Sequence, residues 1–393
     1  MCCIFFYVVC LIVFSIAVEC QTVHDIANLY NNLTDSYQKE VIPAWNQSLP
    51  LEISFAVAPL VMNSFQETEE TISLTAAINL VWNDRRLTWE PKIYGNKEHI
   101  TITTNDIWVP YVYLENGVDE LKPIGDDAPF YAILAYNGNV SWTPGGIFKA
   151  KCPSNMLKFP FDSQTCEFVF AMWGVQVTDT MYVPMGDAGI MTYFTQNSNW
   201  DITNNRQYIK YKDVITEIIF ELSIKRQPVY YIVVIIVPTI LFALMNPLVF
   251  LLPVDSGERV SLGMTILLSY AIFLTIVASS LPASSNPMCL LLFVMILIMV
   301  LSGVIVIGVI MTVYYHHEDN IGSINSYLVR FVSCCCCVSY SNECEGSDEE
   351  YPEKKQKLTV KHIVKTLDIL FMIISYILLI ALLIAYLIYV IVK

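Results

Sequence analysis

Hydroxyl-bearing and apolar side chains recur at helical intervals between residues 261 and 279. Successive members of this stripe are four, three, four, three and four residues apart, so they share one face of a helix. The members of the stripe are Ser261, Thr265, Leu268, Ile272, Thr275 and Ser279. Such a face can line a path for water and ions where several helices surround an axis, or it can join helices within a bundle. The residues alone leave both interpretations open.

No set of side chains indicates catalysis, a cofactor or a bound metal. The five histidines have no cysteine or histidine partner at ligand spacing outside a loop near the C-terminus. We find no acid and base pair and no nucleophile motif, and neither the broken helices nor the internal repeats that are typical of transporters. The sequence therefore disfavours an enzyme or a transporter.

Long apolar segments surround the stripe, and four of them reach the roughly 20 residues that a membrane-spanning helix needs. They are Val229–Leu252, Val260–Leu281, Pro287–Val313 and about Leu367–Val392. Residues 1–20 have a shorter apolar core, which predicts a cleaved signal peptide, with a first membrane anchor as the alternative. A cleaved signal places residues 21–227 and the C-terminus outside the cell. The loop 314–365 then lies in the cytosol, where its lysines fit the positive-inside rule.

The charges divide the chain into an acidic half and an apolar half. The 393 residues carry a formal charge of −14, which excludes most nucleic-acid-binding proteins because these need a basic surface. Only 15% of the residues are charged, below the roughly 25% of a soluble domain. Residues 21–225 hold 24 acidic and 13 basic side chains, a net charge of −11, and most long apolar runs follow residue 228.

Two of the 12 cysteines fall in the predicted outer half. Cys152 and Cys166 enclose 13 residues, and an oxidising compartment favours a disulfide between them over two free thiols. The run Cys334–Cys337 falls in the predicted cytosolic loop. Palmitoylation is favoured there over zinc binding, because adjacent cysteines cannot readily surround one metal ion. Three glycosylation sequons lie in the outer half, at Asn32, Asn46 and Asn139.

The outer half changes its apolar period early in the chain. Residues 22–37 show helical spacing, whereas apolar residues from Ile72 to Trp82 alternate strictly, as a half-buried strand requires. Similar runs, separated by turn signals, are Leu51–Ala58, Glu167–Trp173 and Val214–Ile224. About 200 residues of this kind predict one antiparallel β-sandwich after an N-terminal helix. A β-barrel or two small β-domains are the alternatives.

Several motifs follow one another in an order that resembles one family. The disulfide loop contains Phe159-Pro160-Phe161-Asp162, Trp173 follows Cys166 by seven residues, and the four spans come later. The other motifs are Trp82-Asn-Asp84-Arg-Arg-Leu-Thr-Trp89, Trp108-Val-Pro110, Trp142-Thr-Pro144, Arg226-Gln-Pro228 and Gly257-Glu258-Arg259. In this order they make the mature chain resemble a subunit of the Cys-loop receptors, the pentameric ligand-gated ion channels. The chain is most similar to their cation-selective, nicotinic-type branch.

The resemblance implies an all-β, immunoglobulin-like extracellular sandwich with an N-terminal helix, followed by an all-α four-helix transmembrane bundle. It assigns residues 21–227 to a ligand-binding domain, 228–313 to three transmembrane helices, 314–365 to a cytosolic loop with a short helix, and 366–393 to the fourth helix. It also implies a homo- or hetero-pentamer in the plasma membrane. The expected partners are a small-molecule agonist, permeant cations and membrane lipids.

Under this resemblance the stripe lines the pore. Leu268 is the expected gate ring, with Ile272 beside it, because rings of apolar side chains close a pore by dewetting. A ring of Glu258 carboxylates at the cytosolic mouth concentrates cations, and Asp255 adds to the same field. In the family pattern the basic residue at Arg259 points away from the lumen.

The resemblance also indicates a ligand site, because aromatic rings attract a desolvated ammonium and Trp173 stands at the family's central cage position. Glu115 and Ala77 replace residues that are commonly aromatic, and the segment 204–212 lacks an adjacent cysteine pair. The other candidate ligand residues are Trp108, which is equally a core candidate, Tyr208 and Tyr211. The altered cage predicts that acetylcholine acts weakly or not at all, and that the agonist is a primary or secondary amine or is not cationic.

Four features are candidates for coupling the ligand site to the pore. They are Glu67, Arg226, the loop tip Phe159–Asp162 and the connector Leu281–Asn286. For Glu67, an ordinary acidic surface turn is the alternative. The sequence thus predicts a subunit of a ligand-gated cation channel, with an accessory, non-conducting subunit as the alternative function.

Overall fold

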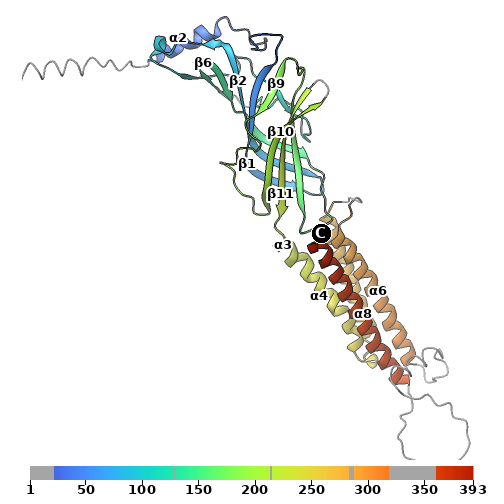
Figure 1. Cartoon of the computed structure of the whole chain (residues 1–393). Coiled ribbons are helices and arrows are strands. Elements are labelled where there is room, and N and C mark those ends of the chain that lie inside the picture. Colours follow the sequence, from blue (N-terminus) through green and yellow to red (C-terminus); the bar gives the residue numbers. More distant parts are fainter. Residues whose placement is uncertain (1–21, 127–129, 213–214, 283–286, 318–359, 393) are drawn as a thin grey trace, which may run out of the picture. The chain divides into compact units, whose positions relative to one another are not determined.

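The computed structural model describes residues 22–126, 130–212, 215–282, 287–317 and 360–392 (Figure 1). The chain divides into two compact units. The first holds the residues up to Ser154 together with Ser163–Lys225. The second holds Asn155–Asp162 together with the residues from Arg226 onward. The tip of the predicted disulfide loop therefore belongs to the helical unit, although the residues on either side of it belong to the first unit.

Helix α2 (Val23–Thr34) opens the first unit. Thr22 caps it: the Thr22 hydroxyl accepts a hydrogen bond from the Asp25 backbone N–H, and the Asp25 carboxylate accepts one from the Thr22 backbone N–H. Leu29 and Leu33 are buried, as the helical spacing predicted. The helix ends three residues before the predicted limit at residue 37.

The first unit is a β-sandwich, which confirms the predicted fold class. Within the described residues its larger sheet has seven strands, in the order β3-β5-β6-β2-β1-β9, with β7 also paired to β2. These strands are β1 (Leu51–Gln66), β2 (Thr71–Thr88), β3 (His99–Ile102), β5 (Ala132–Ala135), β6 (Asn137–Trp142), β7 (Gly145–Lys151) and β9 (Thr180–Pro184). The single-turn helix η1 (Pro91–Tyr94) follows β2. The strictly alternating residues from Ile72 to Trp82 are all buried on one face of β2, as predicted.

The smaller sheet has four strands within the described residues, in the order β10-β11-β8-β4. They are β4 (Val112–Leu114), β8 (Ser163–Met172), β10 (Trp200–Lys212) and β11 (Ile215–Arg226). One strand pair departs from the predicted antiparallel arrangement, because β9 runs parallel to β1. β9 follows β8 of the smaller sheet in the chain and so reaches the larger sheet by a crossover rather than a hairpin.

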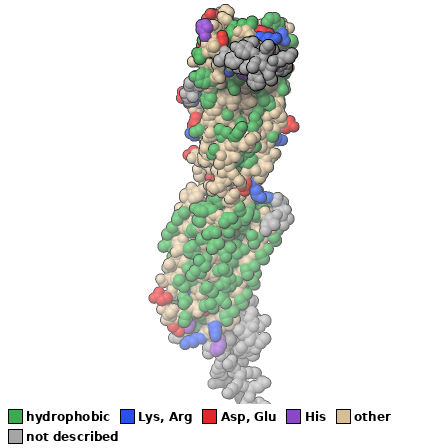
Figure 2. Space-filling view, turned by 90° about the vertical axis from the view of Figure 1, so that its left-hand side faces the viewer, with side chains coloured by type: hydrophobic (Ala, Val, Ile, Leu, Met, Phe, Trp, Pro, Cys, Tyr) green, Lys and Arg blue, Asp and Glu red, His purple; other side chains and the backbone are tan. Residues whose placement is uncertain are grey.

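The described part of the second unit contains four helical stretches that are long and apolar enough to cross a membrane. They are Val229–Leu251, Arg259–Ser279, Leu290–His316 and Val360–Val390. The last three correspond to α5 (Arg259–Ser279), α6 (Leu290–His316) and α8 (Val360–Val392). Hydrophobic side chains cover most of the visible face of this unit (Figure 2). Helix α8 begins seven residues before the predicted start at Leu367, because the more polar residues 360–366 continue the same helix.

The first of these stretches is not a uniform α-helix. It consists of α3 (Val229–Tyr231), a π-helical turn η2 (Ile232–Ile236), α4 (Val237–Met245) and a 3-10 turn η3 (Asn246–Leu251). A second 3-10 turn, η4 (Val254–Ser256), follows it. Pro238 and Pro247 each lack the backbone N–H that a regular helix uses, which accounts for the irregular turns beside them.

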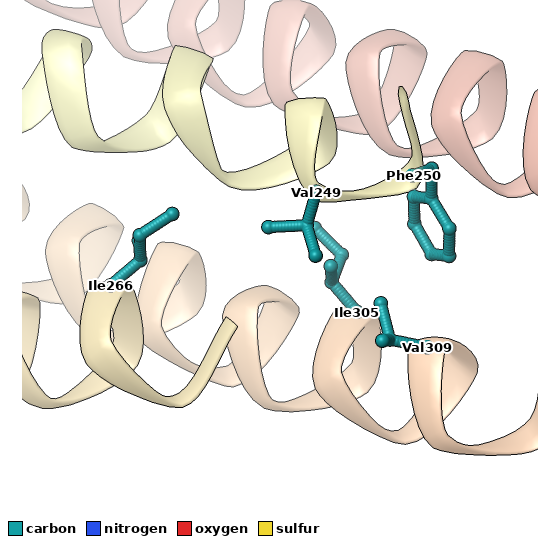
Figure 3. Close-up of a cluster of buried hydrophobic side chains, with 5 residues drawn as sticks. All are labelled: Val249, Phe250, Ile266, Ile305 and Val309. Atoms are coloured by element: carbon teal, nitrogen blue, oxygen red, sulfur yellow. The ribbon is translucent and has the colours of Figure 1, made fainter. Parts of the chain in front are cut away.

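A cluster of apolar side chains joins three of the helical stretches (Figure 3). Val249 and Phe250 come from η3, Ile266 from α5, and Ile305 and Val309 from α6. Phe250 also stacks on Phe371 of α8, with 5.8 Å between ring centroids. The core of this unit therefore fixes which face of α5 is left uncovered.

Candidate functional site

The outer face of the smaller sheet brings together aromatic and acidic side chains. In the strand register, Tyr113 of β4 and Glu217 of β11 both lie opposite Ala171 of β8, one on each side. Trp173 follows β8 and stacks on Tyr113, with 5.8 Å between ring centroids and 26° between ring planes. Trp173 is 48% exposed. Because alternate residues of a strand share a face, Glu115 lies on the same side of the sheet as Tyr113.

The Lys212 ammonium lies between two of the acidic side chains. The Lys212 Nζ donates a hydrogen bond to Glu115 Oε1 at 2.8 Å and forms an ion pair with Glu217 Oε1 at 3.0 Å. The hydrogen bonds to Glu115 and to Glu217 raise the pKa of Lys212 above its ordinary value, so the lysine is charged at neutral pH. Glu115, which was expected to be available to a ligand, already has a cationic partner within its own chain.

The other predicted ligand residues do not all join this group. Trp108 is buried and packs edge-on against Trp82, with 5.6 Å between ring centroids. Its ring is therefore a core side chain, and we remove it from the candidate ligand site. The Tyr208 hydroxyl donates to Glu167 at 3.3 Å, and the Tyr211 side chain is largely exposed.

Helix α5 exposes the complete stripe. Ser261, Thr265, Leu268, Ile272, Thr275 and Ser279 are all exposed in the single chain. Leu268 is 63% exposed and Ile272 is 55% exposed. Gly263, Ile266, Tyr270 and Val277 are buried on the opposite side of the same helix. No other part of the described chain covers this row of apolar and hydroxyl side chains. The row therefore faces other subunits, lipid or water.

Two adjacent residues of opposite charge point in different directions at the start of α5. Glu258 is the N-cap residue and is exposed, and Gly257 before it has φ of 69°, a conformation that glycine adopts readily. Arg259 is buried, and its guanidinium donates to both carboxylate oxygens of Asp368 on α8, at 3.0 and 2.8 Å. It also donates to the Phe250 carbonyl at 2.7 Å. The positive charge is thus held inside the bundle while the negative charge faces out.

Asp255 has a partner of its own within the described residues. Its carboxylate lies 2.8 Å from Nε2 of His316, at the end of α6. The hydrogen bond with His316 lowers the pKa of Asp255, which therefore stays ionised well below neutral pH. The carboxylate that is predicted to add to the field at the pore mouth is thus hydrogen-bonded to a histidine of its own chain.

The loop tip and the residue before the first span form a buried ion pair. Arg226 Nε donates to Asp162 Oδ1 at 2.8 Å and Arg226 Nη2 donates to Asp162 Oδ2 at 3.2 Å, and both side chains are about 1% exposed. The rings of Phe159 and Tyr231 each lie 5.0 Å from the guanidinium carbon. The Tyr386 hydroxyl of α8 donates to the Phe159 carbonyl at 3.2 Å. The helical unit thus covers Phe159 and Pro160, which are buried, whereas Phe161 is exposed.

The remaining predicted residues are placed as follows. Cys152 and Cys166 form a disulfide with an S–S distance of 2.05 Å, as predicted. Asn32, Asn46 and Asn139 are exposed, which leaves glycosylation a prediction. Glu67 is partly buried in the turn between β1 and β2, where the Glu70 N–H donates to its carbonyl. The signal peptide, Cys334–Cys337 and most of the connector Leu281–Asn286 lie outside the described residues.

Three residues of these sites were missed by the sequence reasoning. Tyr113 lies two residues before Glu115, and this spacing in a strand could have indicated that both side chains lie on the same face of the sheet. Lys212 gave no signal, because its partner Glu115 is 97 residues away in the chain. Asp368 is an acidic residue inside a predicted span, and that alone indicates a buried cationic partner.

Comparison with known proteins agrees with this architecture. The family model described as "Neurotransmitter-gated ion-channel ligand binding domain" matches residues 26–228. The model described as "Neurotransmitter-gated ion-channel transmembrane region" matches residues 235–325. The first match alone covers more than half of the chain.

Similar individual proteins are neuronal acetylcholine receptor subunits. The alpha-6 subunit of Pan troglodytes is 32% identical over 266 residues, which cover 65% of this chain and 53% of that protein. The alpha-6 subunit of Homo sapiens is 31% identical with the same coverage. The alpha-3 subunit of Homo sapiens is 30% identical, over 65% of this chain and 52% of that protein. The chain spans about half the length of the curated relatives it matches. The β-sandwich, the disulfide loop, the apolar helices and the two family matches agree. The chain belongs to the neurotransmitter-gated ion-channel family, whose members are ligand-gated channels and not enzymes.

Proposed function

We propose that this chain is a subunit of a pentameric ligand-gated cation channel in the plasma membrane, with α5 lining the pore. The observation that carries the proposal is the division of α5 into two faces. Its buried face packs on the other helical stretches, whereas the stripe from Ser261 to Ser279 is uncovered in one chain. In an assembly of five copies around an axis, the stripe of each copy would face a central pore filled with water and ions. Water suits the hydroxyl groups of the stripe better than lipid does.

Cation selectivity in this proposal comes from Glu258. A ring of exposed carboxylates at a pore mouth attracts cations and repels anions. The basic residue next in the chain does not cancel this charge at the mouth, because Arg259 is neutralised by Asp368 within the bundle. Asp255 adds a weaker negative field that depends on His316.

The β-sandwich lies outside the cell in this proposal, as do both termini. An extracellular sandwich is consistent with its disulfide and with three exposed sequon asparagines, since both modifications belong to the secretory route. The agonist site is the outer face of the smaller sheet, around Trp173 and Tyr113. Only one aromatic pair is present there among the described residues, and the nearby Glu115 is already paired. We therefore infer that acetylcholine and other quaternary ammonium compounds act weakly here, although the relatives are named for acetylcholine.

The proposal can be tested without knowing the agonist. Replacing Leu268 by Ser places a hydroxyl in the narrow apolar ring, which should hydrate the closed gate and open the channel spontaneously. Cells expressing only the Leu268→Ser chain should then carry a standing current whose reversal potential follows sodium and potassium gradients and ignores chloride. Leu262→Ser is the matched control, because Leu262 is exposed on another side of α5. A chloride-dependent reversal potential would refute cation selectivity, and equal currents in both variants would refute the pore-lining face.

One observation favours a second function, an accessory subunit that needs partners. The Lys212 ammonium occupies the carboxylates of the candidate site, as it would in a subunit that does not bind agonist. Surface labelling of the chain expressed alone separates the two functions. A chain that reaches the surface but passes no current as the Leu268→Ser variant, and passes current only beside a second subunit, would be accessory.

A further inference from the structure

The carboxylates of Glu115 and Glu217 form a cation site in which the occupant is already part of the chain. We propose that the Lys212 ammonium is a built-in ligand of this carboxylate pair, which an external ammonium must displace. The inference rests on the proposed ligand site and identifies Lys212 as the residue that sets its affinity for cations.

The burial of the three side chains gives the first argument. Glu217 is 5% exposed, Glu115 is 24% exposed and Lys212 is 54% exposed. The two carboxylates are the more buried members, and they need a counter-charge because a desolvated carboxylate without a partner is costly. Lys212 is the member in contact with water, and a flexible four-carbon stem carries its charge. The exchangeable member of the cluster is therefore the cation.

The remaining binding capacity gives the second argument. One lysine neutralises only one of two carboxylates, so this group of three side chains keeps a net negative charge. Glu115 Oε2 is buried and has no hydrogen-bond partner within the described part of the chain. An ammonium that entered the cluster could donate to this oxygen as well as to the one that Lys212 now holds.

The neighbouring rings give the third argument. Tyr113 lies two residues before Glu115 on the same face, and its ring is stacked on the half-exposed Trp173. A primary ammonium bound at the carboxylates could place an attached aromatic group against this pair. Lys212 carries only methylene groups and uses none of that ring surface in any contact that we observe in the described residues.

Competition with a tethered group has a measurable consequence. A side chain tethered beside the carboxylates has an effective concentration in the millimolar range, so a free cation at lower concentration competes poorly with it. Removing the lysine charge should raise the affinity for an external ammonium on the order of tenfold, the scale of two partly exposed ion pairs. A lysine that merely held the fold together would have no such effect.

The test uses the full chain in lipid nanodiscs and phenethylammonium as the probe, with binding measured by titration calorimetry. Lys212→Gln should bind the probe about tenfold more tightly than the unmodified chain. Lys212→Arg keeps the charge and should stay within twofold. Lys210→Gln is the matched control for long-range charge, because Lys210 is exposed on the same strand. The double variant Lys212→Gln/Glu115→Gln should lose the gain.

Three results would overturn the inference. They are equal, weaker or absent binding in Lys212→Gln, an equal gain in Lys210→Gln, and a gain that survives the loss of the Glu115 carboxylate. Because binding is measured without channel opening, the result is separate from the proposed function. A chain that binds as expected but passes no cations would refute the channel and leave Lys212 as the built-in ligand.

Discussion

The ion pair between Arg259 and Asp368 predicts a large effect from a change of one atom. Asp368→Asn replaces one carboxylate oxygen by an NH2 group and leaves the buried Arg259 guanidinium without a counter-charge. Removing one partner of a buried pair typically costs roughly 3–5 kcal/mol. Arg259 keeps its hydrogen bonds to the Phe250 carbonyl and the Thr312 hydroxyl, so we expect the lower end, about 3 kcal/mol.

The assay is thermal unfolding of the purified chain, followed by size-exclusion chromatography with fluorescence detection. For a unit of this size a loss of about 3 kcal/mol lowers the unfolding midpoint by on the order of 10 °C. The matched control is Asp255→Asn, which also removes a hydrogen-bonded carboxylate from the helical unit. That carboxylate is mostly exposed, so water replaces its partner and the midpoint should hardly move.

A double variant distinguishes an unpaired charge from lost packing. Arg259→Met/Asp368→Leu removes both charges and keeps apolar volume, which is often neutral in buried ion pairs. It should recover most of the stability that Asp368→Asn loses. The reasoning is refuted if the two single carboxylate variants shift the midpoint equally, or if the double variant is less stable than Asp368→Asn.

Three further predictions concern the channel. Glu258→Ala should reduce the single-channel cation conductance and the selectivity over chloride, measured from current amplitudes and reversal potentials; unchanged values would contradict the charge ring. Ile272→Ser should open the channel less readily than Leu268→Ser when standing currents are compared at equal surface expression, and the reverse order would move the gate to Ile272. Trp173→Ala should weaken the response to a cationic agonist severalfold, since a cation–π contact at a half-exposed ring contributes about 1 kcal/mol. A submicromolar response of the unmodified channel to acetylcholine would contradict the inferred agonist class.

The predictable part of the fold is the part in which one face of an element is buried. Apolar residues from Ile72 to Trp82 alternate because β2 has one core face, and the period alone reveals the strand. The four membrane-spanning stretches could be predicted because the length and apolar composition of a segment alone decide whether it can cross a membrane. The irregular turns of the first stretch were not predicted, although Pro238 and Pro247 mark where the hydrogen-bond pattern breaks.

The sites divide in the same way. The stripe on α5 is a local pattern, and its exposure in the structure agrees with the periodicity. The partners of Arg259 and Glu115 depend on packing between elements that are 109 and 97 residues apart in the chain. No local period carries that information, so the sequence indicated the residues but not the pairs. Arg226 was expected at the coupling region, and the structure pairs it with Asp162 of the loop tip.

The assignment of the loop tip to the helical unit matters for anyone who produces the β-sandwich alone. A secreted fragment ending at Lys225 would lack Tyr231 and Tyr386, so the apolar Phe159 would lose its cover. It would also lack Arg226, which leaves the carboxylate of Asp162 without its ion-pair partner. Such a fragment would expose the apolar side chains of the loop tip and would tend to aggregate, even if both of its sheets fold correctly. Polar replacements at the tip should make the fragment soluble. The eight residues Asn155–Asp162 would then determine the solubility of the isolated domain.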